Sequence, residues 1–351
     1  MKKYSVMFLT VVLSAFMFFG CGNGNEGKDN NADSVAKVNE FEVLIKYLEE
    51  NGNFINSDAV PAMIGADVVY ENVDNAKFKV LDLRGQVDFL TGHINHATNV
   101  KTEDLLTYFE NDIVPSDYEK IILVCYSGQT ASYATSILRI VGYDNVYAMK
   151  YGMSSWNKKF AENMWSAKVT SDYVDQLETA GNAKNQKGDH PTIETGKTDP
   201  KEILMERAQI ALSAPYKTKL VKAEDLFVNG SQYYIMNYWA AEKYDMGHIP
   251  GAIQYTPKKS FITTADLYTL PIDKPVVTYC YTGQTAAFVT AYLTILGYDA
   301  KSLGFGANSF MHSILKANEW HAFGAGAIHD YDFIEEEVGD DVANEGGPSC
   351  G

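Results

Sequence analysis

The stretch "CYSGQT" occupies residues 125–130, and a near copy, "CYTGQT", occupies residues 280–285. A short apolar run comes directly before each cysteine, "KIILV" in the first copy and "KPVVTY" in the second. After each loop, apolar residues recur at helical spacing until Gly142 or Gly297. This pattern predicts that each cysteine follows a buried strand and that its loop opens a helix.

The similarity between the two copies extends well beyond these loops. The cysteines are 280 − 125 = 155 residues apart. At the same offset "TGHINHATN" (91–99) falls on "MGHIPGAIQ" (246–254), and "ILRIVGYD" (137–144) falls on "YLTILGYD" (292–299). Matching blocks in the same order indicate a tandem duplication.

The composition shifts along the chain predict six parts. These are a signal peptide (1–20), a flexible tether (21–40), a first domain (41–165), a linker (166–200), a second domain (201–325) and an acidic C-terminal tail (326–351). The linker is polar with room for one short helix. Disorder is the default expectation for the tail, because it is acidic and ends in glycine.

The N-terminus combines a basic start, "MKKYS", with an apolar run of 15 residues. Such a run is too short for a transmembrane helix and fits a secretory signal. It ends at Gly20-Cys21, and this junction resembles a bacterial lipoprotein signal. The resemblance implies that Cys21 carries lipid and anchors the protein in the bacterial cell envelope, at the outer membrane or the periplasmic face. An ordinary signal peptide is the alternative.

Charge and cysteine usage narrow the function classes. With 29 basic and 45 acidic residues the net charge is −16, which argues against nucleic-acid binding. If Cys21 carries lipid, three cysteines remain, and an odd count suggests a free reactive thiol. His93 and His96 are not accompanied by further ligand residues, so we expect no metal and no other cofactor.

The position of each cysteine has a chemical consequence. A helix N-terminus offers unpaired N–H groups and a positive partial charge, which favour a thiolate. Gly128 and Gly283 lack a Cβ atom and allow each loop to curl so that its N–H groups converge on the sulfur. The sequence therefore predicts a nucleophilic thiol in each copy. A buried cysteine packed as a small hydrophobe is the alternative.

Together these blocks resemble the rhodanese family. The first copy carries "LDLR" (81–84), "GHI" (92–94) and the C-x-x-G-x-T loop, followed by the helix and "GY". The resemblance implies an α/β protein with two tandem rhodanese-like domains, each a parallel five-stranded sheet flanked by helices on both faces. It also implies a sulfurtransferase that takes sulfane sulfur from a donor as a cysteine persulfide.

The resemblance also assigns roles to individual residues. Cys125 and Cys280 would carry the sulfur between a small donor and a thiophilic acceptor. An anion cradle would be formed by the loop amides, namely Tyr126, Ser127, Gly128, Gln129 and Thr130 in the first copy and Tyr281, Thr282, Gly283, Gln284 and Thr285 in the second. Neither loop holds a cation, so a persulfide or polysulfide is an alternative donor to thiosulfate.

Tyrosine phosphatases use a related loop, H-C-x5-R, whose arginine clamps phosphate. That position is Ala131 in one copy and Ala286 in the other, and Val124 or Tyr279 precedes the cysteine where the phosphatase has histidine. Phosphatase chemistry is therefore disfavoured.

The two copies differ around the loops. Asp82 and Arg84 support the first loop and are expected to form a structural ion pair, whereas Asn237 and Trp239 stand at the matching positions in the second copy. We therefore expect Cys125 to be the preferred carrier. In both "GHI" turns the family context suggests that the histidine makes a structural hydrogen bond.

Two other functions remain open from the sequence. One is a non-catalytic binding module, because uncharged loops could hold a small anion or peptide without turnover. The other is a thiol redox protein, in which Cys350 reaches a loop cysteine and resolves a persulfide. The sequence identifies no protein partner.

Overall fold

A computed structural model describes residues 38–339, which fall in one compact unit. The predicted signal peptide, Cys21 and Cys350 lie outside the described residues. The lipid anchor, the cell-envelope location and the redox role of Cys350 therefore stay predictions.

Two five-stranded parallel sheets form the framework. The first has the order β1-β5-β4-β2-β3 and consists of β1 (Met63–Ile64), β2 (Phe78–Asp82), β3 (Thr98–Asn99), β4 (Lys120–Val124) and β5 (Val146–Met149). The second has the equivalent order β6-β10-β9-β7-β8 and consists of β6 (Leu220–Val221), β7 (Tyr234–Asn237), β8 (Ile253–Gln254), β9 (Val276–Tyr279) and β10 (Ala300–Leu303). Every pairing is parallel, which confirms the predicted α/β fold with two tandem sheets.

Helices surround both sheets, with short 3₁₀ turns between them. The first domain contains α2 (Ala66–Glu71), α3 (Gln86–Leu90), α4 (Leu105–Asn111), α5 (Gln129–Ile140), α6 (Met153–Trp156) and α7 (Lys158–Ala161). The second contains α9 (Ala223–Asn229), α10 (Ala241–Tyr244), α11 (Gln284–Ile295) and α12 (His312–Ala317). Two further helices, α1 (Glu40–Glu50) and α8 (Pro200–Ser213), precede the first and second sheets.

The predicted strand–loop–helix unit is present in both copies. β4 and β9 are central strands whose apolar residues are buried, as expected where helices cover both faces of a parallel sheet. Gly128 (φ 79°) and Gly283 (φ 73°) cap the helices that follow. At these left-handed angles a side chain would be strained, so glycine allows the chain to turn directly from strand into helix.

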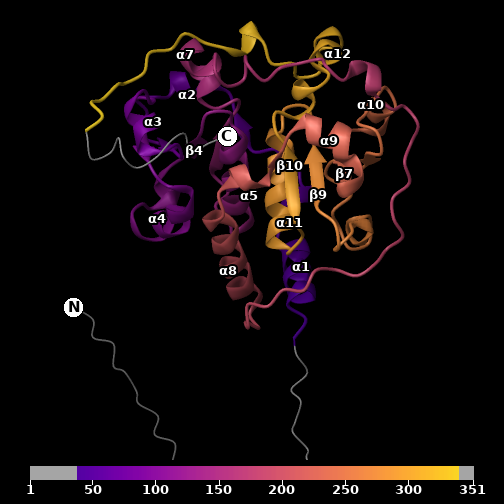
Figure 1. Ribbon diagram of the computed structural model, residues 1–351. Coiled ribbons are helices and arrows are strands. Elements are labelled where there is room, and N and C mark those ends of the chain that lie inside the picture. The colour runs from indigo at the N-terminus through magenta and orange to yellow at the C-terminus, as the bar shows by residue number, and fades with distance from the viewer. Residues whose placement is uncertain (1–37, 340–351) are drawn as a thin grey trace, which may run out of the picture. The chain divides into compact units, whose positions relative to one another are not determined.

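The two helices that follow the cysteine loops, α5 and α11, pack against each other between the sheets (Figure 1). Tyr133 and Ile137 from α5 and Phe288 and Tyr292 from α11 belong to one hydrophobic core that extends through both domains. Ser136 Oγ donates a hydrogen bond to the Phe288 carbonyl across the interface, at 2.9 Å. The two domains therefore share a core.

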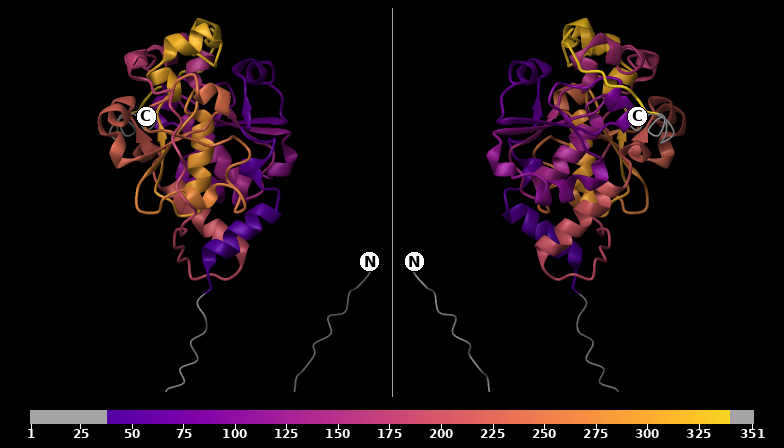
Figure 2. Two further views of the ribbon diagram at one scale, coloured as in Figure 1. Left: turned by 90° about the vertical axis from the view of Figure 1, so that its right-hand side faces the viewer. Right: turned by 90° about the vertical axis from the view of Figure 1, so that its left-hand side faces the viewer.

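The helices α1 and α8 each reach the domain that they do not precede, and α8 also binds its own domain, because Arg207 donates to the Thr294 and Ile295 carbonyls. From α1, Phe41 packs on Tyr268 of the second domain, and Glu49 accepts a 2.6 Å hydrogen bond from the amide of Thr263. From α8, the Ala211 carbonyl accepts a hydrogen bond from Tyr133 in the first domain. Figures 1 and 2 show both helices together at one end of the molecule, with α8 beneath α5 and α1 beneath α11.

The acidic tail packs on the first domain as far as Glu336, so the expectation of disorder is wrong for residues 328–336. We call residues 328–336 the C-terminal strap. Ile334 exchanges two backbone hydrogen bonds with His93, at 2.9 and 2.8 Å. The rings of Tyr331 and Phe333 pack on Tyr70 and Phe160. These two aromatic anchors offset the cost of ordering an otherwise acidic segment.

The linker packs on the second domain as the C-terminal strap packs on the first. Glu178 exchanges two backbone hydrogen bonds with His248 of the second domain, each 2.9 Å long, and the amide of Thr170 donates to Asn308. The linker contains one 3₁₀ turn, Val174–Gln176. Each domain is thus completed by a segment that follows the other domain in sequence (Figure 1).

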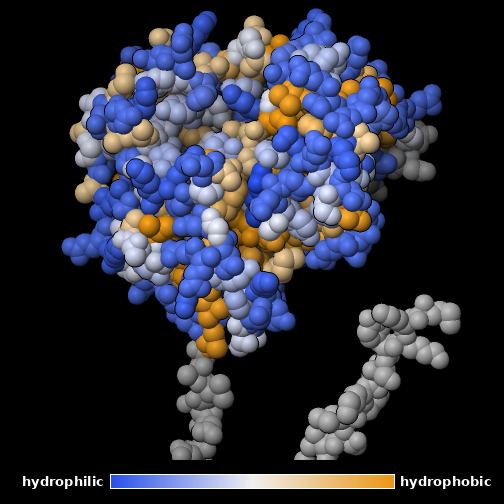
Figure 3. All heavy atoms as spheres, turned by 180° about the vertical axis from the view of Figure 1, so that it is seen from behind, coloured by the Kyte–Doolittle hydropathy of each residue, from blue (hydrophilic) through white to orange (hydrophobic). Residues whose placement is uncertain are grey.

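The surface agrees with the acidic composition. Seen from behind, it is mostly hydrophilic, with hydrophobic patches along the middle (Figure 3). Within residues 38–339, no helix has the length and apolar character needed to cross a membrane.

Because the two domains share a core, we expect Phe288→Ala to destabilise both together. Removing a fully buried phenylalanine leaves a cavity and costs about 3–5 kcal/mol of the free energy of unfolding. Denaturant unfolding followed by a probe in each domain should give one transition, shifted equally for both probes. A shift confined to the second domain would contradict the shared core.

Candidate functional site

Both loop thiols lie at the carboxyl end of a central strand and the first turn of the next helix. The sulfur of Cys125 accepts a hydrogen bond from the amide of Ala131 at 3.4 Å, and that of Cys280 accepts one from Ala286 at 3.3 Å. Cys125 is 0% exposed and Cys280 is 3% exposed. Both are free thiols. The predicted helix N-terminal position is therefore present, but each sulfur is covered.

The sequence predicts that each thiolate is favoured, but burial acts against the charged form. Burial raises the pKa of both thiols, and backbone N–H groups that point at each sulfur lower it only in part. For Cys125 these groups come from Ala131, Gly128 and Ser127, and for Cys280 from Ala286, Thr282, Gly283 and Thr285. The expectation of a favoured thiolate is thus wrong for the closed loops, because desolvation outweighs the amide dipoles.

The loop residues are held by contacts from several elements. In the first loop Tyr126 donates a 2.9 Å hydrogen bond to Asp88, the Ser127 carbonyl accepts one from Trp165, and Ser132 Oγ donates to the Gly128 carbonyl. The structure brings all the predicted cradle residues to the two strand–helix junctions. Gln129 and Gln284 differ from the rest, since their side chains reach into the opposite domain.

Asp82 and Arg84 form the expected structural ion pair. The guanidinium donates from Nε to one carboxylate oxygen at 3.0 Å and from Nη2 to the other at 2.6 Å, and it also binds the Gly92 carbonyl. Burial alone would lower the pKa of Arg84, but the Asp82 carboxylate outweighs it and raises that pKa. The same carboxylate also raises the pKa of Cys125. The pair therefore supports the loop without activating its thiol.

In the second copy an aromatic stack replaces this ion pair. Arg84 lies over the ring of Tyr126 at 4.9 Å, whereas Trp239 stacks on Tyr281 with ring centroids 4.8 Å apart. The surrounding framework is kept. Asn99 Nδ2 donates to the Arg84 carbonyl at 2.7 Å, and Gln254 Nε2 donates to the Trp239 carbonyl at 2.6 Å. The second loop has the same support without the charges.

The histidines of the "GHI" turns make the expected structural hydrogen bonds. His93 Nδ1 bonds the Phe89 carbonyl at 2.9 Å, and His248 Nδ1 bonds the Tyr244 carbonyl at 2.8 Å. Within residues 38–339, no group of three or more His, Cys, Asp or Glu side chains gathers in a geometry that could hold a metal ion.

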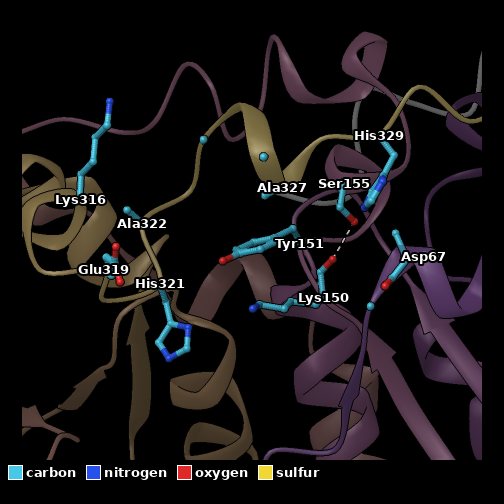
Figure 4. A pocket seen from close by; sticks show the side chains of 14 residues that line it. Asp67, Lys150, Tyr151, Ser155, Lys316, Glu319, His321, Ala322, Ala327 and His329 are labelled. Carbon is cyan, nitrogen blue, oxygen red and sulfur yellow. Dashed lines mark hydrogen bonds between the residues drawn. The ribbon is translucent and has the colours of Figure 1, made fainter.

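A cavity of about 660 Å³ lies between the two domains. Residues of both domains line it, including Asp67, Lys150, Tyr151, Ser155, Lys316, Glu319, His321 and His329. In Figure 4 the Lys150 ammonium and the Tyr151 hydroxyl point to the same side, toward His321. Sequence reasoning missed Lys150 and His321, because they lie outside the loops and meet only through the packing of the two domains.

Charges of both signs line the cavity, namely Lys150 and Lys316 with Asp67 and Glu319. Lys150 is half-buried, and burial lowers its pKa. Burial and then the charge of Lys150 lower the pKa of His321, whose ring lies 5.5 Å from that of Tyr281. Burial raises the pKa of Tyr151 to about 12, with a smaller contribution from a charge on Cys280. The cavity therefore reaches the second loop only through His321, whose ring lies beside Tyr281, and Lys150 adds a positive charge to the cavity lining.

Comparison with known proteins identifies the family. The profile of the rhodanese-like domain matches this chain twice, at residues 65–159 and 235–312. The thiosulfate sulfurtransferase GlpE of Shewanella oneidensis is 31% identical over 81 residues, which cover 23% of this chain and 76% of that protein. The chain belongs to the rhodanese-like family. It contains two rhodanese-like domains in tandem, as the repeat predicts.

Similarity to solved structures is lower. The thiosulfate sulfurtransferase from Pseudomonas aeruginosa matches with a TM-score of 0.29 and 14% identity, over 86% of this chain and 48% of that chain. The 3-mercaptopyruvate sulfotransferase SseA from Escherichia coli matches with a TM-score of 0.27 and 18% identity, over 69% of this chain and 97% of that one. Membership of the rhodanese-like family rests on the profile and on the Shewanella relative.

The raised thiol pKa values predict an unusual pH dependence of alkylation. An ordinary cysteine has a pKa of about 8.5, and a thiol with a higher pKa is less often in the thiolate form at any given pH. The alkylation rates of Cys125 and Cys280 should therefore keep rising above the pH at which the same thiols level off in the unfolded chain. Iodoacetamide labelling followed by peptide mass spectrometry measures both. A plateau at or below the unfolded-chain value would refute the effect of burial.

Proposed function

We propose that this rhodanese-like protein is a sulfurtransferase that carries sulfane sulfur as a persulfide on its loop cysteines. The observation that supports this most strongly is the convergence of backbone N–H groups on each sulfur at the start of a helix. Such fixed donors stabilise negative charge that develops on sulfur during transfer. Their presence in both copies supports a role for both thiols.

The proposed transfer has two steps. After the thiol loses its proton, the thiolate attacks the outer sulfur of the donor. A new S–S bond forms as the donor's own S–S bond breaks, and the electron pair leaves with the rest of the donor. An acceptor thiolate then attacks the outer sulfur of the persulfide and restores the cysteine thiolate. Splitting the transfer in this way gives ping-pong kinetics.

Because both sulfurs are covered, the proposal requires each loop to open when a donor approaches. Opening removes the desolvation that raises the thiol pKa, while the amides of the helix N-terminus remain close to the sulfur. The closed loop would then protect the persulfide from water and from other thiols.

We propose that Cys280 takes sulfur from the donor first. The sequence favours Cys125 because Asp82 and Arg84 accompany it, but Arg84 is neutralised by Asp82, and the Asp82 charge raises the pKa of Cys125. No carboxylate contributes to the raised pKa of Cys280, and Tyr281 of its loop lies beside His321, which lines the cavity together with Lys150. The local charges thus favour the second thiol.

Lys150 supports an anionic donor such as thiosulfate or a polysulfide. Its ammonium lies beside the cavity, 5.1 Å from the ring centroid of Tyr151. A half-buried lysine attracts an anion more strongly than an exposed one, because water screens it less. The cavity thereby supplies the cation that the loop sequences do not.

Mass spectrometry on single cysteine variants tests the persulfide. After exposure to thiosulfate or polysulfide, we expect the Cys280 peptide to gain one sulfur, about 32 Da. Cys280→Ser should lower turnover more than Cys125→Ser does. If neither loop peptide gains sulfur with any donor, the sulfurtransferase proposal fails and a non-catalytic binding module takes its place.

Lys150→Met tests the charge in the cavity. We expect KM for thiosulfate to rise about tenfold, which is the effect of losing about 1.4 kcal/mol of binding, with a smaller change in kcat. In the unchanged protein KM should also rise with pH, as Lys150 loses its proton below the usual range for lysine. Lys316→Met is the matched control, because this lysine lines the same cavity but points away from it in Figure 4. Equal effects of the two variants would contradict the assignment of Lys150.

A further inference from the structure

The fourth residue after each cysteine is a fully buried glutamine whose side chain enters the opposite domain. Gln129 Oε1 accepts a 2.8 Å hydrogen bond from the amide of Phe305 in the second domain. Gln284 Oε1 accepts one of 3.3 Å from the amide of Tyr151 in the first domain. These two bonds form a reciprocal pair across the domain interface, and no step of the proposed sulfur transfer uses them.

Gln284 binds the turn that holds the Cys125 loop, and Gln129 binds the turn that holds the Cys280 loop. Tyr151 begins the turn after β5, in which the amide of Met153 donates to the Cys125 carbonyl at 2.8 Å. Phe305 begins the matching turn after β10, in which the amide of Ala307 donates to the Cys280 carbonyl at 2.9 Å. Two hydrogen bonds, joined by the backbone of the turn, therefore connect the glutamine of one loop with the cysteine of the other.

The glutamines also touch the opposite loop directly. A Cβ atom on Gly128 would collide with the Gln284 side chain, and one on Gly283 would collide with the Gln129 side chain. Each glycine therefore makes room for the glutamine of the opposite domain. This contact explains why each loop contains a glycine followed by a glutamine. The explanation does not depend on the chemistry of the cysteine.

We propose that Gln129 and Gln284 are positioning residues, each of which holds the thiol loop of the opposite domain in its closed form. On this proposal the second loop needs Gln284 for the closure of the Cys125 loop, whatever chemistry Cys280 performs. The proposal goes beyond sulfur transfer, because it concerns the closure of the loops and would hold for any use of the thiols.

The two glutamines are not equivalent. Gln129 Nε2 also donates to Ser127 Oγ in its own loop at 3.1 Å, whereas the buried Gln284 Nε2 has no hydrogen-bond partner within residues 38–339. The one hydrogen bond of the Gln284 side chain within the described residues crosses to the other domain, which makes Gln284 the cleaner position to test.

The experiment compares alkylation of the two cysteines in the full chain carrying Gln284→Met. Methionine has a similar length but cannot accept the hydrogen bond, so the buried amide of Tyr151 is left without its partner. We expect iodoacetamide to label Cys125 about tenfold faster across neutral to alkaline pH, corresponding to a loss of about 1.4 kcal/mol in loop closure. Labelling of Cys280, in the same loop as the substitution, should change far less.

Thr290→Val is the matched control on the same helix. Its hydroxyl donates only to carbonyls of its own domain, Ala286 and Lys301, so labelling of Cys125 should stay unchanged. If Gln284→Met lowers the denaturation midpoint, Gln284→Asn replaces it, because the shorter amide cannot reach Tyr151. Equal acceleration at both cysteines, or no acceleration at Cys125, would overturn the proposal.

Discussion

The packing of α5 against α11 is the constraint on which the rest of the structure depends. Each helix begins directly after a thiol loop, and both are buried almost along their whole length. Pairing them places the two loops at one domain interface, where Gln129 and Gln284 can cross. The helices α1 and α8 lie below this pair in Figure 1, and the linker and the C-terminal strap each pack on the domain that they do not directly follow. The two copies therefore form one body, with both thiol loops at the shared interface.

The same packing sets the chemistry of the thiols. A helix N-terminus on its own would favour the thiolate, but enclosure between two domains removes water and raises the pKa of both sulfurs. Each loop therefore holds backbone N–H groups that stabilise a negative charge on sulfur. The burial of the same sulfur disfavours that charge. Opening of the loop, rather than the resting electrostatics, would control reactivity. In the proposed function, the charge that steers an anionic donor would come from Lys150, which lies outside both loops.

The sequence predicts what depends on local pattern. The strand–loop–helix unit at each cysteine could be read from motifs and spacing, and so could the Asp82–Arg84 pair. The two parallel sheets and the structural roles of His93 and His248 followed from the resemblance to the rhodanese family. The burial of the thiols, the bridging helices α1 and α8, the ordered strap and the cavity at Lys150 could not be predicted. Each of these depends on contacts between segments far apart in the chain, about which periodicity and propensity carry no information.

Hydrogen exchange in the first loop after alkylation of the second tests this linkage most directly. In a Cys125→Ser chain only Cys280 of the two loop cysteines can react, and its side chain is 3% exposed, so the second loop has to open for the reagent to reach it. On the proposed linkage, the bulky adduct keeps this loop open and displaces Gln284. The account predicts faster exchange at the amides of residues 126–131 in the first domain. Changes confined to residues 280–286 would contradict it.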